Sequence, residues 1–576
     1  MNPTRVFWRV AAALALSLSM GAAGSAPSSQ EGSAQGSQAV SPQRSRADAQ
    51  AFIDEATRKY NAGLTNSSKP GQTIVPAAGP NWAADLDTWV EYTFPASSGA
   101  SCMNGTPYRM YYKVSSDAGM RDKVLVDFEG GGACWDFQSC RPDADTGAAN
   151  PDGLPSGYIQ GDGIVSKTAL LLTSPVLEGN TFLVEAAARL LFGRGSGKLD
   201  DGWWGRLWQT TTAPETQKWT KVVFPYCTGD VSAGASFRSF NDPAAPDDAT
   251  KTRYVNFNGL NNVRAAMKFL QDNKFTQSLS DRGYLQQLLV YGGSAGGYSA
   301  QFNYPMIRQA LAGEKTRVAL LNDSGPLLTA PVYGSGEIIS PADLEKTPAA
   351  KFWQLASHTW GFFQQPLTAD LRVPGHPEYA EQASGVIARW EKTTGKKVNI
   401  TKAAGGDTGS FSTVLSNRYP NDRFGLTSFQ QDQVISRFFF IGAQNAEVAG
   451  LEGSALRDAK LKLFQKEMDL VRGNLGPLPN FGYYMPWSRY LVIGSHVTTA
   501  LTFAGTETSR AANMRDDGGR IQPAFDGDVG HFLNNLLSTN SLEAEPVLKE
   551  VGPEKAEPLN LAGVAGWLLS LFNVFG

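Results

Sequence analysis

The hydrophobic positions of this chain form short apolar runs separated by stretches with helical spacing. Runs rich in Val, Leu and aromatic residues predict buried strands at residues 124–128, 221–224, 288–291, 317–321 and 490–493. A helix is predicted between two of these strands, where apolar residues recur every three or four positions: Val263, Ala266, Met267 and Leu270. Asn261 is its expected N-cap. Strands alternating with helices indicate an α/β fold with a mainly parallel central sheet flanked by helices.

Two long intervals, residues 143–219 and 330–425, interrupt this alternation. The first contains an apolar run at 182–191, and the second mixes helical and loop patterns. Insertions of this size form lids or walls of a binding site, or they add helices at the edge of a sheet, and both interpretations are open here. We expect one domain over residues 81–550 that carries both insertions.

The N-terminus has the pattern of a signal peptide. Arg5 and Arg9 precede an apolar run at 10–20, and small residues at 24–26 resemble a cleavage site. The run is shorter than the roughly 20 apolar residues of a membrane span. Residues 1–26 are therefore predicted to be removed on export, to the periplasm or the cell exterior, which leaves no transmembrane anchor.

The segments at both ends of the predicted domain differ from it in composition. Residues 27–80 begin with a tract rich in Ser, Gly, Gln and Ala and are predicted to be a mobile linker and N-terminal extension. Residues 551–576 are an apolar tail, and its run at 559–575 either packs as a last helix or lies on an interface.

Composition narrows the classes of partner. The net charge is −3, so the Lys/Arg excess typical of nucleic-acid-binding proteins is absent. Export makes disulfides the expected state of the four cysteines. Cys134 and Cys140 are near enough in sequence to close a small loop, which leaves Cys102 to pair with Cys227. A zinc site is the alternative, although the spacing matches no standard zinc motif.

The clearest chemical signal is Gly292-Gly293-Ser294-Ala295-Gly296, which fits the pattern G-x-S-x-G. A predicted strand precedes it and a helix-compatible segment over 297–311 follows, which is the strand–turn–helix context of a nucleophile elbow. The alternative is a glycine-rich turn with an incidental serine. Ser294 is the candidate nucleophile of a serine hydrolase.

A serine nucleophile needs a base, and the chain has only four histidines. His358 lies in a helix-like aromatic stretch, His376 precedes a proline within the second insertion, and His531 opens an amphipathic segment. His496 follows the late predicted strand through a short loop, which is where this fold places its base. We therefore favour His496 and retain His531 as the alternative.

Local pattern does not rank the candidates for the acid that orients the histidine. Asp323, Asp422 and Asp432 all lie between Ser294 and His496 in the chain. Asp323 follows a predicted strand, where it suits a structural cap, and Asp422 follows a turn-forming Pro-Asn pair.

Several segments resemble the pectin acetylesterase and Notum family of secreted carboxylesterases. The resemblance is carried, in family order, by residues 102–107, 129–135 with Cys140, 224–231, 291–297 and 323–325. It implies an α/β-hydrolase that cleaves acyl esters without a metal or organic cofactor. It further implies that Asp432, in Gln431-Asp432-Gln433, is the acid, and it supports His496 as the base.

The resemblance also indicates the oxyanion hole. The predicted strand 124–128 leads into a Gly run, and the N–H groups of Gly131 and Gly132 would join that of Ala295 in stabilising the oxyanion. The alternative is a plain strand-to-loop turn. The chain departs from the family here: relatives usually carry Trp just after the second Gly of this loop, whereas this chain has Gly132-Ala133, with Trp135 after the cysteine.

These departures leave the substrate open. An acetylated polysaccharide is the first expectation, because the family points to it and the chain is predicted to be exported. A lipid-like or polyester substrate is the alternative, motivated by the apolar runs at 182–191 and 559–575. A protein of another class, a secreted non-catalytic binding protein on a hydrolase scaffold, is the third hypothesis.

Overall fold

A computed structural model of the chain describes residues 45–63, 75–76, 80–141, 149–154, 214–329, 347–362, 408–440, 448–488, 495–499, 506, 508 and 528–554. Several predicted features lie outside these residues: the leader 1–26, the apolar runs 182–191 and 559–575, the strand 490–493, and His376.

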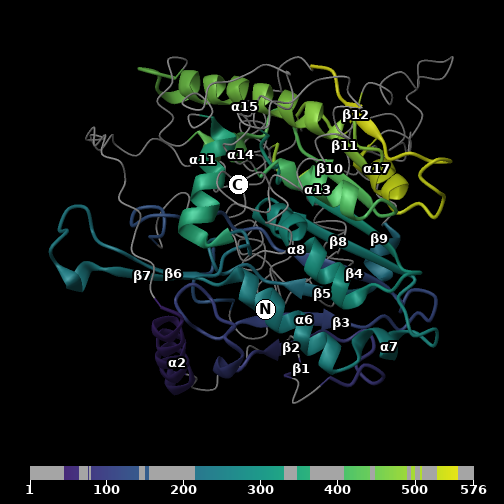
Figure 1. Cartoon of the computed structure of the whole chain (residues 1–576), viewed down its shortest axis with the longest axis horizontal. Coiled ribbons are helices and arrows are strands. Elements are labelled where there is room, and N and C mark those ends of the chain that lie inside the picture. The colour runs from purple at the N-terminus through teal and green to yellow at the C-terminus, as the bar shows by residue number, and fades with distance from the viewer. Residues whose placement is uncertain are drawn as a thin grey trace, which may run out of the picture.

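A ten-stranded sheet forms the centre of the molecule (Figure 1), in the order β1-β2-β3-β5-β4-β8-β9-β10-β11-β12. The strands are β1 (Val75–Pro76), β2 (Val90–Thr93), β3 (Arg109–Lys113), β4 (Lys123–Phe128), β5 (Thr220–Phe224), β8 (Gln287–Gly293), β9 (Arg317–Asp323), β10 (Arg423–Thr427), β11 (Phe481–Met485) and β12 (Lys549–Val551). From β5 to β12 all neighbours pair in parallel, and only β3 runs antiparallel to both of its neighbours. A separate hairpin consists of β6 (Ser236–Phe240) and β7 (Arg253–Phe257).

The predicted strands 124–128, 221–224, 288–291 and 317–321 are confirmed as parts of β4, β5, β8 and β9. Their side chains alternate between two apolar cores, one on each face of the sheet. In β8, for example, Leu288 and Val290 belong to one core and Leu289 and Tyr291 to the other. Because both faces are buried, these strands read as continuous apolar runs, which is why the sequence pattern identifies them.

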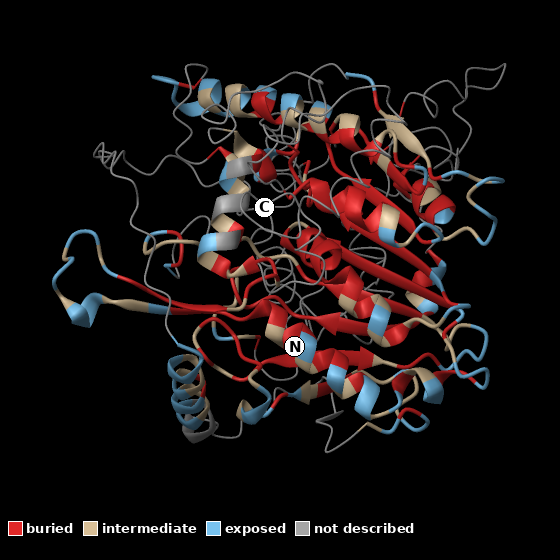
Figure 2. Ribbon diagram, viewed as in Figure 1, coloured by how far each residue is buried: buried red, intermediate tan, exposed pale blue. Residues whose placement is uncertain are grey.

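Helices cover both faces of the sheet, so the α/β-hydrolase-like architecture is confirmed (Figures 1 and 2). The larger core includes side chains of α6 (Gly259–Asp272), α7 (Phe275–Leu279), α8 (Ala295–Leu311), α13 (Ser410–Arg418), α14 (Gln433–Phe439) and α15 (Gly453–Leu475), and the smaller one those of α17 (Val529–Leu536). A short helix α11 (Pro348–Gln354) continues into a π-helix over Leu355–Trp360. Short 3₁₀ helices span Ala96–Ser98, Glu215–Lys218 and Ala249–Lys251.

The predicted apolar face of α6 is confirmed, since all four of its predicted apolar residues are buried. The predicted cap is wrong: Asn258, not Asn261, is the N-cap residue, because the helix begins at Gly259. In the second interval, residues 410–425 belong to α13, the turn after it and the start of β10, so this end of the interval is part of the main body.

The N-terminal extension contains a helix, α2 (Arg46–Gly63), within the range predicted to be a mobile linker and extension. Ile53 is 3% exposed, and the rings of Phe52 and Phe237 lie 5.0 Å apart between centroids. The side chain of Gln50 also donates to the carbonyl of Ala96 at 3.2 Å. This segment therefore packs against the β6–β7 hairpin and the main domain, and few apolar residues suffice for the contact.

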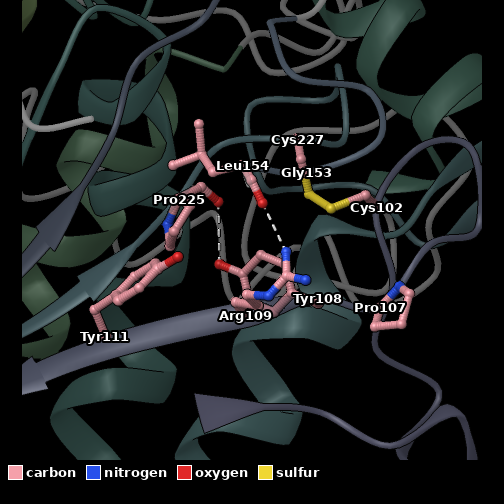
Figure 3. A pocket seen from close by; sticks show the side chains of 9 residues that line it. All are labelled: Cys102, Pro107, Tyr108, Arg109, Tyr111, Gly153, Leu154, Pro225 and Cys227. Carbon is pink, nitrogen blue, oxygen red and sulfur yellow. Dashed lines mark hydrogen bonds between the residues drawn. A yellow bond between two sulfur atoms is a disulfide. The ribbon is translucent and has the colours of Figure 1, made fainter. Parts of the chain in front are cut away.

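Both predicted disulfides are present, Cys102–Cys227 and Cys134–Cys140. The first joins residues separated by 125 positions and the second joins residues separated by 6. Figure 3 shows the surroundings of the first disulfide, where the Tyr108 hydroxyl donates to Pro225 O at 3.2 Å and Arg109 Nη1 to Leu154 O at 2.6 Å. The first of these bonds holds the loop after β5, and the second holds Leu154, against the start of β3.

Candidate active site

Ser294 occupies the turn between β8 and α8. Its φ of 58° and ψ of −125° lie outside the usual regions for a residue with a side chain, as expected of a nucleophile elbow. Between Gln287 and Pro305 it is the one residue that is not buried. The helix α8 begins at the next residue, so the N–H groups of its first turn and the positive end of its dipole lie beside the serine.

The elbow lies against the end of β4. A Cβ atom on Gly296 would lie 2.0 Å from the carbonyl oxygen of Phe128, which is the last residue of β4. The loop that carries Gly131 and Gly132 begins directly after this residue, and Gly132 has a φ of +75° that favours glycine. The carbonyl of Gly131 accepts the N–H of Ala149 at 2.8 Å, which holds this loop. The candidate oxyanion donors thus come from two segments in direct contact.

Asp432 and His496 form a hydrogen-bonded pair. The Nδ1 atom of His496 lies 2.9 Å from Oδ2 and 3.1 Å from Oδ1 of Asp432. A carboxylate only accepts, so Nδ1 carries the proton and Nε2 is the basic nitrogen of the ring. The Asp432 side chain is fully buried, whereas that of His496 is 18% exposed.

The start of α14 holds the Asp432 side chain in place. Asp432 is the N-cap of α14, and Oδ1 accepts the backbone N–H groups of Val434 at 3.0 Å and Ile435 at 2.9 Å. The pKa of the Tyr298 hydroxyl is raised, mainly by burial and to a lesser extent by the negative charge of Asp432. Tyr298 lies one turn after Ser294 on α8, so the field of Asp432 reaches the first turn of that helix.

The loop that carries His496 lies over the ends of β8, β9 and β10. The Val497 side chain packs on Gly293, with its Cγ1 3.1 Å from where a Cβ on that glycine would be. The residue after His496 therefore contacts the residue before Ser294. Thr498 Oγ1 bonds Thr427 Oγ1 at 2.8 Å, and Thr499 Oγ1 bonds the Tyr291 hydroxyl at 2.7 Å. Neither threonine is predicted from the sequence, since no local pattern distinguishes them from other loop residues.

The other candidate residues lie in different surroundings. His531 is in the first turn of the amphipathic helix α17, where its N–H donates to Asp528 at 3.1 Å. His358 is exposed and lies in the π-helix. Asp422 accepts from Tyr304 at 2.9 Å and from Arg308, just before β10 begins, at the opposite end of that strand from Asp432.

Asp323 is fully buried at the end of β9, as a structural residue would be. Its carboxylate accepts from Thr498 and Thr499, which follow His496 in the chain. Within the described residues, no group of three or more His, Cys, Asp or Glu side chains has the arrangement of a metal site. Among those same residues, no helix has the length and apolar composition needed to cross a bilayer.

No family model matches the sequence, and no curated protein matches it significantly. Solved structures that are similar to the chain include two crystal forms of the Wnt deacylase Notum from Drosophila. One is 16% identical with a TM-score of 0.36, over 67% of this chain and 81% of that one. The other is 13% identical with a TM-score of 0.36, over 80% of this chain and 95% of that one. The fold assignment above rests on the sheet topology and the elbow.

Proposed function

We propose that this chain is an exported serine carboxylesterase that hydrolyses acyl esters through an acyl-enzyme. Ser294 is the nucleophile, His496 the base and Asp432 the acid that orients it. Gly131, Gly132 and Ala295 supply the oxyanion donors. The observation that supports this best is the hydrogen bond between His496 and the buried Asp432. Val497, the residue after His496, packs on Gly293, the residue before the strained Ser294.

In the proposed reaction, Ser294 Oγ attacks the ester carbonyl carbon while its proton passes to Nε2 of His496. The carbonyl oxygen becomes an oxyanion, stabilised by N–H donors from the glycine loop and Ala295. The C–O bond to the alcohol then breaks, and the alcohol leaves with the proton from Nε2. A water molecule attacks the acyl-enzyme in the same way, which releases the carboxylic acid and restores Ser294.

The proposed substrate class is an acetylated polysaccharide. The sequence resemblance to pectin acetylesterases and the predicted signal peptide support it. The alternative is an ester of a longer acyl chain, and the apolar runs that motivate it lie outside the described residues. No cofactor takes part in the proposed chemistry.

Hydrolysis of p-nitrophenyl acetate, butyrate, octanoate and palmitate by the purified chain tests this proposal. We expect the wild type to cleave acetate fastest and Ser294→Ala to lose the activity. Ser278→Ala, at an exposed position in α7, is the matched control and should retain it.

Two other outcomes with these p-nitrophenyl esters would change the proposed function. A preference for octanoate or longer esters would replace the deacetylase with a lipase-like deacylase. Equal and negligible rates for wild type and Ser294→Ala would contradict the esterase and favour a secreted binding protein.

A further inference from the structure

Asp323 is the last residue of β9, and it is bonded to both sides of the candidate active site. Its backbone carbonyl accepts the N–H of Ser294 at 2.8 Å. Its fully buried carboxylate accepts the N–H groups of Thr498 and Thr499, each at 2.8 Å. One residue therefore joins the serine turn to the loop that follows His496.

The carboxylate of Asp323 is occupied by donors from this loop and from its own neighbour. Oδ1 accepts Thr498 Oγ1 at 3.0 Å and Ser324 Oγ at 3.0 Å, and Oδ2 accepts Thr499 Oγ1 at 2.6 Å. Five donors to one buried carboxylate form a strong, directional anchor, because bonds to a charged acceptor are stronger than neutral ones. The loop is thereby held through main chain and side chain together.

The neighbour Ser324 extends this anchor to the residue next to the histidine. Its Oγ accepts the N–H of Val497 at 3.1 Å, while its own N–H donates to the carbonyl of Thr427 at 2.7 Å. Ser324 has a φ of 60°, a conformation that costs energy outside glycine and that a structure maintains only where surrounding bonds impose it. Residues 497, 498 and 499 are therefore all bonded to the 323–324 pair.

We propose that Asp323 is a positioning residue that sets the place of His496 relative to Ser294, through its bonds to Thr498 and Thr499. The carboxylate of Asp323 accepts hydrogen bonds from the loop that follows His496, whereas that of Asp432 accepts from the imidazole itself. The two aspartates therefore have separate roles. The catalytic consequence rests on the proposed esterase function. The positioning of His496 can be tested without it.

Substitutions in the full chain separate this role from general stability. Asp323→Asn removes the charge and turns an amide donor toward the N–H groups, and Thr499→Val removes one hydroxyl with little change of volume. Thr499→Ser keeps the hydroxyl and is the rescue variant. Asp422→Asn is the matched control, a nearly buried carboxylate at the opposite end of the neighbouring strand, bonded to Tyr304 and Arg308.

We expect Asp323→Asn to lower kcat for p-nitrophenyl acetate by roughly 10- to 100-fold with KM nearly unchanged, since a misplacement of about 1 Å has effects of that size. Thr499→Val should show a smaller loss of kcat, and Thr499→Ser should resemble the wild type. Asp422→Asn should lower the melting temperature and leave kcat unchanged in the folded protein.

A second readout needs no ester. The chain has only four histidines, so ¹⁵N-histidine labelling gives a small set of imidazole N–H signals. The Nδ1–H signal of His496, identified by its loss in His496→Gln, should persist in Asp422→Asn and disappear or broaden in Asp323→Asn. If the wild type hydrolyses no ester, the proposed function fails and this signal still decides the positioning role.

The proposal is overturned if folded Asp323→Asn keeps both the kcat and the His496 signal of the wild type. It is also overturned if Asp422→Asn lowers kcat to the same extent, since general destabilisation would then explain the loss. If Asp323→Asn does not fold, the comparison of Thr499→Val with Thr499→Ser decides, and equal kcat values for the two would contradict the proposal.

Discussion

At the scale of single residues, the proposed chemistry depends on which nitrogen of His496 carries its proton. Both oxygens of Asp432 lie within 3.1 Å of Nδ1, so the ring presents Nε2 as its basic nitrogen. Asp432 in turn is fixed by two N–H groups at the start of α14. The N-cap of α14 thus orients the proposed base. A substitution at this cap should lower kcat more than it lowers the free energy of unfolding.

We expect Asp432→Asn to lower kcat for p-nitrophenyl acetate by about 10³- to 10⁴-fold, because an amide in this position favours the wrong tautomer of the ring. Steady-state kinetics on folded protein measures this. Asp528→Asn alters the corresponding cap of α17, whose side chain accepts from His531, and should leave kcat unchanged. A loss of less than tenfold in Asp432→Asn would contradict the role given to Asp432.

These residues differ in how far the sequence predicts them. The run of glycines around Ser294 has a local signature, so the strand–turn–helix there was predictable. The Asp432–His496 contact joins residues separated by 64 positions, and only the family resemblance pointed to Asp432. Thr498, Thr499 and the anchoring bonds of Asp323 were not predictable, because their partners meet only when three parallel strands end at the same edge.

At the scale of elements, the crossing of α8 and β4 is too close for any side chain at Gly296. Gly296→Ala would bring a Cβ to within 2.0 Å of Phe128 O, so we expect a loss of about 1–3 kcal/mol in unfolding free energy, or more, and a marked loss of activity. Gly119→Ala is the control, since its Cβ would meet no neighbour closer than 3.4 Å. Urea unfolding of both variants measures the difference, and equal midpoints would contradict the close crossing.

The helix α15 contains a carboxyl group whose ionisation opposes folding. Burial raises the pKa of Glu467 from 4.5 to about 7. The folded chain therefore keeps this proton between about pH 4.5 and 7, where the unfolded chain has lost it. The free energy of unfolding is therefore not reduced by this group below pH 4.5. It falls as the pH rises from there to about 7, because the folded chain holds a proton that the unfolded chain has released.

Glu467→Gln should remove this dependence. We expect the variant to match the wild type at pH 4 and to be more stable at pH 8, by up to roughly 3 kcal/mol, since one pKa unit corresponds to about 1.4 kcal/mol. Urea midpoints measured at both pH values test this. A wild type that is as stable as the variant at pH 8 would contradict the burial of a charge at this position.

The helices and strands with a clear periodicity of apolar residues were predictable from the sequence, and those with few apolar residues were not. The buried strands β4, β5, β8 and β9 and the apolar face of α6 follow directly from periodicity. The helix α2 was not predicted, because its contacts depend on a few residues such as Phe52 and Ile53 within a polar segment. The strand β10 was also missed, since Gly425 interrupts a short run in which apolar residues are few.

At the scale of the whole molecule, the two disulfides should differ in their effect on stability. Cys102–Cys227 restrains a span of 125 residues in the unfolded chain and Cys134–Cys140 a span of 6. On the chain-entropy account the longer span gives on the order of 2–3 kcal/mol more stability. Replacing both cysteines of the first pair by Ala should therefore lower the melting temperature more than the same change in the second, as calorimetry would show. The reverse order would contradict this account.

The proposed function of the whole molecule depends on Ser294 being an activated nucleophile. The most direct test treats the folded chain with a fluorophosphonate and locates the adduct by peptide mass spectrometry. We predict one adduct per chain, on Ser294, which is absent from Ser294→Ala and forms far more slowly in His496→Gln. No adduct on the folded wild type, or an adduct on another residue with Ser294 unmodified, would contradict it.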